Sequence, residues 1–156
     1  MPGRKRAQRD ERGAVAVEMA LITPLLVMLV FGIIQFGIVL AQQVALGNGA
    51  RQGARFGVVG ARTCAQIQSE AQAAASTIGM AASQVWVAVY LNNNPTPVCG
   101  ESQAGASTTT KPCLGSAIDD TIKVTTRYDS SLIIPFGPSE PIFTLSSKGV
   151  FRCEYS

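Results

Sequence analysis

The first half of the chain contains a long, uninterrupted run of apolar residues. No lysine, arginine, aspartate or glutamate occurs from residue 19 to residue 50, and about 20 apolar residues are enough for a helix to cross a bilayer. The run is rich in Leu, Ile, Val, Met and Phe at first and becomes richer in Gln, Ala and Gly after residue 41. The pattern predicts one long helix over residues 14–57, with a transmembrane part at residues 19–41.

Two features would weaken this helix if it were isolated. Pro24 has no amide hydrogen, so it is expected to kink or loosen the helix locally. Gly47, Gly49 and Gly53 each disfavour a helix by about 1 kcal/mol relative to alanine. Packing against other elements must compensate for these glycines if the segment is helical.

Small residues recur at every fourth position through the same segment. Because four residues advance a helix by slightly more than one turn, these positions form a ridge that winds slowly around the axis. Such a ridge lets other helices approach closely, although alanine and glycine are common enough for part of the run to be coincidence. The predicted packing positions are Gly37, Ala41, Ala45, Gly49, Gly53 and Gly57.

A second helix and two strands are predicted beyond residue 57. Residues 65–80 have helical spacing, with Ile67, Ala71, Ala74 and Ile78 on one face. Residues 84–91 and 121–128 show the alternation of half-buried strands and are rich in β-branched and aromatic residues. On the second strand, one face carries Ile122, Val124, Thr126 and Tyr128.

The remaining segments are predicted to be turns and a final strand. Residues 92–116 are rich in Asn, Pro, Gly, Ser and Thr and are expected to form a loop, and residues 130–141 contain three prolines typical of a turn region. Residues 142–155 predict either a strand pair or one strand bulged at Gly149. The expected fold is therefore α+β: a long helix continuing into a small domain, residues 58–156, with a second helix and a three- to four-stranded antiparallel sheet.

Charge is concentrated at the N-terminus. The net charge of the chain is +3, and residues 1–13 are polar, basic and expected to be disordered. The charged residues there are Arg4, Lys5, Arg6, Arg9 and Arg12, with Asp10 and Glu11. A basic segment before an apolar helix predicts a cytoplasmic N-terminus and a domain on the other side of the membrane, although Arg51, Arg55 and Arg62 blur the asymmetry. No basic face is interleaved with aromatic residues, so nucleic-acid binding is not expected.

All four cysteines follow the apolar run. An even number of cysteines in an exported domain favours two disulfides, whereas a zinc site would need four scattered thiolates. Four cysteines allow three pairings, and the sequence does not choose among them; the preferred pairing joins Cys99 to Cys113 across a loop and Cys64 to Cys153 at the domain ends.

The sequence offers little for catalysis. Because the chain has no histidine, the common catalytic triads and histidine-metal sites are excluded. The pair Asp119-Asp120 is expected to cap or turn the chain before a strand rather than to act as a catalytic carboxylate pair. Arg51 and Arg55 share a helix face and are expected to be solvated or to contact acids of a neighbouring subunit. We therefore expect no enzyme activity, cofactor or metal.

Three interpretations of the N-terminus compete. A secretory signal peptide cut near Ala41 would need an apolar core longer than the 7–15 residues usual for such peptides. A plain single-pass anchor would leave Glu18 near the membrane edge without a role. A type IV pilin-like leader would end at Gly13 and be followed directly by an apolar helix whose fifth residue is Glu18.

The third interpretation carries a resemblance to a known family. GAVAVEMALITPLL from residue 13, GIIQFG at 32–37 and ARQGARFG at 50–57 together resemble the TadE-like family of pilus-assembly proteins. Gln35 and Gln52 stand where that family commonly has acids, which puts any ion pairs at these positions in doubt. The similarity covers about 45 residues and is specific only in combination.

The resemblance implies a pseudopilin, minor pilin or assembly factor of a tight-adherence (Flp) pilus. A prepilin peptidase would cut between Gly13 and Ala14, so that residues 1–13 are a leader. Glu18 would then set subunit register by pairing with the new amine of a neighbouring subunit, and Pro24 would be the family's helix proline. The implied partners are that peptidase, other pilins and pseudopilins of the pilus, its inner-membrane assembly platform and membrane lipid.

Overall fold

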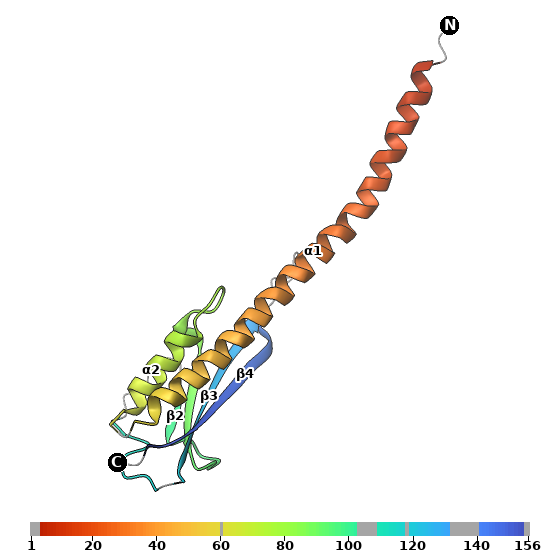
Figure 1. Cartoon of the computed structure of the whole chain (residues 1–156). Helices are drawn as coiled ribbons and strands as arrows, with labels where there is room; N and C mark the ends of the chain where they lie inside the picture. Colours follow the sequence, from red (N-terminus) through yellow and green to blue (C-terminus); the bar gives the residue numbers. More distant parts are fainter. Residues whose placement is uncertain (1–3, 60, 103–108, 118, 132–140, 155–156) are drawn as a thin grey trace. The chain divides into compact units, whose positions relative to one another are not determined.

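Figure 1 shows the computed structural model of the chain, which describes residues 4–59, 61–102, 109–117, 119–131 and 141–154. The chain divides into two compact units, Met1–Gly37 and Ile38–Ser156. The elements, in chain order, are α1 (Arg4–Gly57), α2 (Cys64–Ala75), the short 3-10 helix η1 (Ala82–Gln84), β1 (Trp86–Leu91), β2 (Cys99–Ser102), β3 (Thr121–Ser131) and β4 (Pro141–Arg152). The predicted α+β fold, with two helices and an antiparallel sheet, is confirmed.

Helix α1 is longer at its N-terminus than predicted. It begins at Arg4, so the expectation that residues 1–13 are disordered is wrong from Arg4 onward. This segment contains four arginines together with one lysine, one alanine, one glutamine and one glutamate, which are good helix formers, and only Asp10 and Gly13 disfavour the helix. The helix continues across Pro24 and ends at Gly57, the predicted position.

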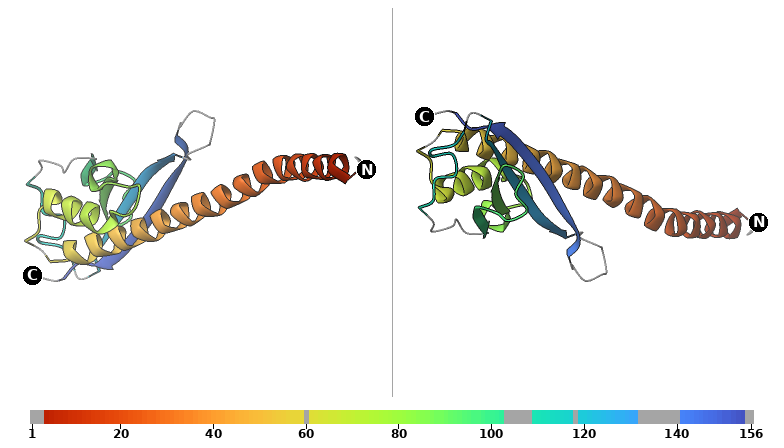
Figure 2. Two further views of the ribbon diagram at one scale, coloured as in Figure 1. Left: turned by 90° about the horizontal axis from the view of Figure 1, so that it is seen from above. Right: turned by 90° about the horizontal axis from the view of Figure 1, so that it is seen from below.

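The four strands form one antiparallel sheet in the order β2-β1-β3-β4. The pair β3 and β4, seen side by side in both views of Figure 2, is in register from Thr121 opposite Arg152 to Ser130 opposite Phe143. Strand β1 pairs regularly with β3 from Trp86 to Leu91. Three of the strands match predicted segments, and β2 lies in a segment predicted to be loop.

One face of the sheet forms the core with the helices. The alternation predicted for β3 is confirmed, because Ile122, Val124, Thr126 and Tyr128 are all buried. Opposite them on β1, Val87 and Val89 are also fully buried. Within the second unit, α2 and residues 38–57 of α1 pack on this face, as the remaining core residues show: Leu46, Ala54, Ile67, Ala71 and Ala75.

Helix α2 ends earlier than predicted. Its last residue is Ala75, because Ser76 adopts an extended conformation with ψ of 137°. Thr77 and Met80 then form a tight turn through two backbone hydrogen bonds, and Gly79 has φ of +73°. Ile78, predicted on the buried helix face, lies in this turn with its side chain 78% exposed.

The last strand also differs from one of the predicted forms. Strand β4 is a single strand, and its pairing with β3 is regular around Gly149, so the expected bulge there is wrong. The irregularity lies between Ser130 and Ser131 of β3. The turn predicted for residues 130–141 is wrong at its two ends, which belong to β3 and β4; residues 132–140 lie outside the described residues.

The opposite face of the sheet is polar. Trp86 and Tyr90 of β1 lie on it. The Arg127 guanidinium lies 5.4 Å from the centre of the Trp86 ring, and the Lys123 ammonium lies 4.4 Å from that of Tyr90. Arg127 also forms a 3.1 Å ion pair with Glu101 of β2.

Candidate functional site

The N-terminal part of α1 is an exposed apolar segment. Every residue from 13 to 34 is exposed, although the segment is mostly Leu, Ile, Val, Met and Phe. Within the described part of the chain, one helix, spanning Gly13–Gly57, is long and apolar enough to cross a membrane; its most apolar window has a mean hydropathy of 2.5 and is 0% buried. Apolar side chains on this scale are unfavourable in water, so the segment requires an apolar environment.

Gly13, Glu18 and Pro24 lie along this exposed segment. A Cβ added to Gly13 would meet nothing within 4 Å. Glu18 is exposed and has no hydrogen bond or ion pair to the described residues. Next to Pro24, the Thr23 hydroxyl donates a 2.6 Å hydrogen bond to the Met19 carbonyl one turn earlier.

The small-residue positions divide into two groups. At Gly37 an added Cβ would meet nothing within 4 Å, Ala41 is exposed, and Ala45 lies at the edge of the core with 9% exposure. At the second group the same test finds close neighbours. A Cβ added at Gly49 would lie 2.6 Å from the Ala71 carbonyl oxygen and from the Ala75 Cβ. One added at Gly53 would lie 2.7 Å from the Ala71 Cβ, and one added at Gly57 would lie 2.7 Å from the Ile122 Cδ1.

The second group therefore serves the chain's own domain. Gly49, Gly53 and Gly57 allow α2 and the sheet to approach the α1 backbone more closely than any side chain would permit. This contact accounts for the glycines that would weaken an isolated helix, because burial against α2 compensates for their low helix propensity. Ala14 begins the exposed segment and takes no part in this packing.

Polar side chains tie α1 to β3 and β4. The Thr126 hydroxyl donates to the Leu46 carbonyl at 3.0 Å, and the Ser130 hydroxyl donates to Gln42 Oε1 at 2.9 Å. On the next strand, Gln43 Nε2 donates to the Ser146 carbonyl at 3.1 Å. The Thr126 and Ser130 bonds are buried and fix the position of α1 on the sheet, because leaving one partner unsatisfied is unfavourable by about 1–3 kcal/mol.

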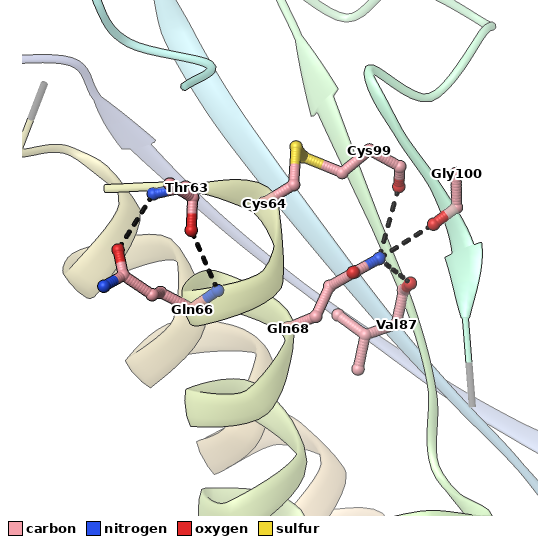
Figure 3. Close-up of a disulfide and its surroundings, with 7 residues drawn as sticks. All are labelled: Thr63, Cys64, Gln66, Gln68, Val87, Cys99 and Gly100. Carbon is pink, nitrogen blue, oxygen red and sulfur yellow. Dashed lines mark hydrogen bonds between the residues drawn. A yellow bond between two sulfur atoms is a disulfide. The ribbon is translucent and has the colours of Figure 1, made fainter. Parts of the chain in front are cut away.

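The four cysteines form two disulfides, but in a pairing different from the preferred one. Cys64 pairs with Cys99, and Cys113 pairs with Cys153. Cys99 begins β2, which pairs with β1 beneath the start of α2, and this arrangement brings it to Cys64 (Figure 3). The chain then returns past the start of α2, where the Thr110 carbonyl accepts from the Cys64 amide, and Cys113 meets Cys153 at the end of β4.

Two glutamines on the buried face of α2 were not singled out from the sequence. Figure 3 shows the side-chain amide of Gln68 donating to the carbonyls of Val87, Cys99 and Gly100, at 3.0, 3.4 and 2.8 Å. One turn later, the Gln72 amide donates to the Val85 carbonyl at 3.0 Å. A signal was present, since the two glutamines are four residues apart beside the buried Ile67 and Ala71.

The residues considered for chemistry are engaged in structure. Asp120 accepts hydrogen bonds from Asn92 and from the Ala117 amide, and Asp119 forms an exposed 3.4 Å ion pair with Arg152, so the pair organises the turn before β3. Arg51 and Arg55 are exposed on α1. Among the described residues, no group of three or more His, Cys, Asp or Glu side chains is placed to hold a metal ion.

The comparisons with known proteins concern the same N-terminal segment. Residues 13–55 match the family model described as TadE-like protein. The N-terminal segment of this chain is TadE-like. The resemblance predicted from the sequence is confirmed for this segment. Searches among curated proteins and among solved structures found no match to the chain.

The TadE-like segment begins at Gly13 and ends at Arg55. It thus contains Glu18 and Pro24, and it reaches Gly49 and Gly53, where α1 packs against α2. The match leaves out α2, the sheet and both disulfides, whose description rests on the structure alone.

Proposed function

We propose that this chain is a membrane-anchored minor pilin, pseudopilin or assembly factor of a tight-adherence (Flp, type IV-like) pilus, and that it has no catalytic activity. A prepilin peptidase cuts it between Gly13 and Ala14. The mature helix then stays in the cytoplasmic membrane or enters the pilus, where its domain contacts other pilins and the assembly platform. The TadE-like match over residues 13–55 supports this assignment.

The observation that carries the proposal is the environment of Gly13. The fold does not require glycine at this position, because an added Cβ would meet nothing within 4 Å and a helix favours alanine over glycine by about 1 kcal/mol. The family match nevertheless begins at this residue. Recognition of this glycine by another protein, such as a peptidase that cuts after it, would explain why glycine occupies the position.

Glu18 supports the proposal through its charge. A carboxylate within the bilayer is unfavourable by about 2.5–3.5 kcal/mol on insertion scales, and no described residue of this chain pairs with Glu18. Cleavage after Gly13 would create an α-amino group on Ala14. Pairing between that amine on one subunit and Glu18 on its neighbour would compensate both charges and fix the axial stagger of the two helices.

The disulfides and the charge distribution support the orientation. The basic residues before the apolar segment favour a cytoplasmic N-terminus. Both disulfides lie beyond α1, and disulfides persist in oxidising compartments outside the cytoplasm. Both observations support an extracytoplasmic domain.

A matched pair of glycine variants tests the proposal. Gly13→Ala and Gly32→Ala both place a methyl group in open space on α1, so neither should disturb the fold. In cells with the matching peptidase, Gly13→Ala should accumulate as the uncut precursor, whereas Gly32→Ala should be processed like the wild type. Processing is followed by electrophoresis of the membrane fraction. Normal processing of Gly13→Ala would contradict the proposed cleavage.

A further inference from the structure

Helix α2 runs antiparallel to the C-terminal part of α1. Its first turns lie at Gly57, which neighbours Ile67, and its last residue, Ala75, lies against Gly49. Continuing in the same direction, Ser76 and Thr77 reach the level of Leu40 and Ala41 and line a groove with them. The complete lining is Leu40, Ala41, Val44, Ala45, Asn48, Ala74, Ser76 and Thr77, around a volume of about 450 Å³.

The turn after α2 thus lies beside the end of the predicted transmembrane segment, which closes at Ala41. In Figure 1 it is the yellow-green loop beyond the upper end of α2. The turn is firmly held, because Thr77 and Met80 exchange two backbone hydrogen bonds and the Tyr128 hydroxyl donates to the Gly79 carbonyl at 2.9 Å. Met80 is buried beneath it, whereas Ile78 points away from the core and is 78% exposed.

The α1 side of this groove is largely apolar, its polar lining residues (Asn48, Ser76 and Thr77) are uncharged, and Ile78 adds an exposed apolar side chain beside it. Leu40 is 50% exposed and Val44 is 63% exposed on the neighbouring turns of α1. Neither element carries a formal charge here, since residues 19–50 and residues 71–100 contain no Lys, Arg, Asp or Glu. Exposed apolar patches that continue from an apolar helix are typical of contact with a membrane.

We propose that the Thr77–Met80 turn is a second membrane contact, with Ile78 inserted into the interfacial region of the bilayer from which α1 emerges. The groove between the turn and α1 then opens toward lipid and binds the carbon atoms of a lipid acyl chain or headgroup. The occupant is lipid because Leu40 and Ala41 in the groove belong to the predicted transmembrane segment, and because neither α1 nor the turn carries a formal charge here. The contact sets the height of the domain above the bilayer. This inference rests on the proposed membrane anchoring of α1.

Tryptophan quenching by brominated lipid tests the inference in the full chain. In a Trp86→Phe background, single tryptophans are placed at Ile78, at Phe31 within the apolar helix, and at Leu114. Leu114 is a matched control, because it is a 61% exposed apolar residue next to Cys113. The Cys113–Cys153 disulfide lies near the end of α1. This end is about 22 Å along the helix from Gln42, which follows the predicted transmembrane segment, so Leu114 should lie away from the bilayer.

The proteins are reconstituted in phosphatidylcholine vesicles that carry bromine on acyl-chain carbons close to the headgroup, for the tryptophans at residues 78 and 114, or near the chain ends, for the tryptophan at residue 31. We expect Ile78→Trp to be blue-shifted and quenched, Phe31→Trp to be quenched, and Leu114→Trp to emit as in unbrominated lipid. Quenching at Phe31 but not at Ile78 would overturn the inference and leave the anchor intact. Lack of quenching at Phe31 would overturn the membrane span itself.

Two further outcomes would also overturn it. Equal quenching of Ile78→Trp and Leu114→Trp would mean that the domain lies flat on the bilayer rather than touching it at this turn. A blue shift at Ile78 that disappears when protein is diluted into excess lipid would assign the groove to a second copy of the chain instead of lipid.

Discussion

Gly149 lies where β4 packs against the backbone of α1, and its replacement by alanine tests how the helix is seated on the sheet. A Cβ at this position would lie 2.5 Å from the Ala50 carbonyl oxygen, 2.7 Å from the Ala50 carbonyl carbon and 2.8 Å from the Arg51 Cα. All three atoms belong to the helix backbone, so no side chain can rotate away. The helix itself must move.

The size of the effect follows from this geometry. Ordinary contact begins at 3.4 Å, so α1 must move away by nearly 1 Å, a gap that loses about a quarter to a half of the dispersion attraction across it. Overpacking of this kind destabilises by about 1–3 kcal/mol. Replacing a glycine within a strand by alanine stabilises the fold by about 0.5–1 kcal/mol, which offsets part of this loss. The midpoints of these two ranges give an expected net loss of roughly 1 kcal/mol.

Gly100 supplies the control, because it is also a strand glycine and an added Cβ there would meet nothing within 4 Å. Both variants are unfolded with urea in non-ionic detergent, with Trp86 fluorescence as the probe. Gly149→Ala should unfold at lower urea than the wild type, and Gly100→Ala should equal the wild type or exceed it by less than about 1 kcal/mol. Equal midpoints for the two variants would refute the close packing of α1 on β4.

Two other predictions concern the cysteines and Glu18. Cleavage after Glu70, Glu101 and Glu140 separates the four cysteines into different peptides. Non-reducing mass spectrometry should find the Cys64 peptide joined to the Cys99 peptide, and the Cys113 peptide joined to the Cys153 peptide. A Cys99 peptide joined to the Cys113 peptide would contradict the fold. Glu18→Ala should insert into the membrane normally, because it removes a charge next to the membrane-spanning segment. It should be absent from sheared pili, whereas Val17→Ala should be present. Pili that contain Glu18→Ala would exclude the register role.

Regular alternation was the part of the fold most directly visible in the sequence. In β3 every second residue is apolar or Thr, and a strand with one buried face must place those residues together. The apolar helix was visible for a similar reason, since its length and lack of charge admit few alternatives. Both patterns are local in the sequence, so they could be recognised without knowing which distant segments contact each other.

The features that were missed depend on distant contacts. The sequence AASTI carries no strong helix breaker, yet α2 ends at Ala75 because the following turn is held by Tyr128, 49 residues away from Gly79. Strand β2 is four residues long and polar, and it exists where Gln68 holds the carbonyls of Cys99 and Gly100. Without β2 in view, the pairing of Cys64 with Cys99 could not be foreseen.

The small-residue ridge shows how far the candidate site could be predicted. Its spacing indicated close packing, but spacing could not say which helix or sheet would fill it. The structure places α2 and β3 against Gly49, Gly53 and Gly57 and leaves Gly37 without a neighbour within 4 Å. The leader and Glu18 could be proposed from the sequence because a processing motif is read by another protein and must therefore be present in the sequence itself.

The central claim is that this chain is a precursor cut after Gly13. Mass spectrometry of the N-terminus of the protein purified from its own cell membranes tests it directly. The account predicts a mature chain that begins at Ala14, with or without an N-methyl group. A chain that begins at Met1 or Pro2 would show an uncut anchor, and one that begins at Gln42 would show a secreted protein; either result would contradict the account.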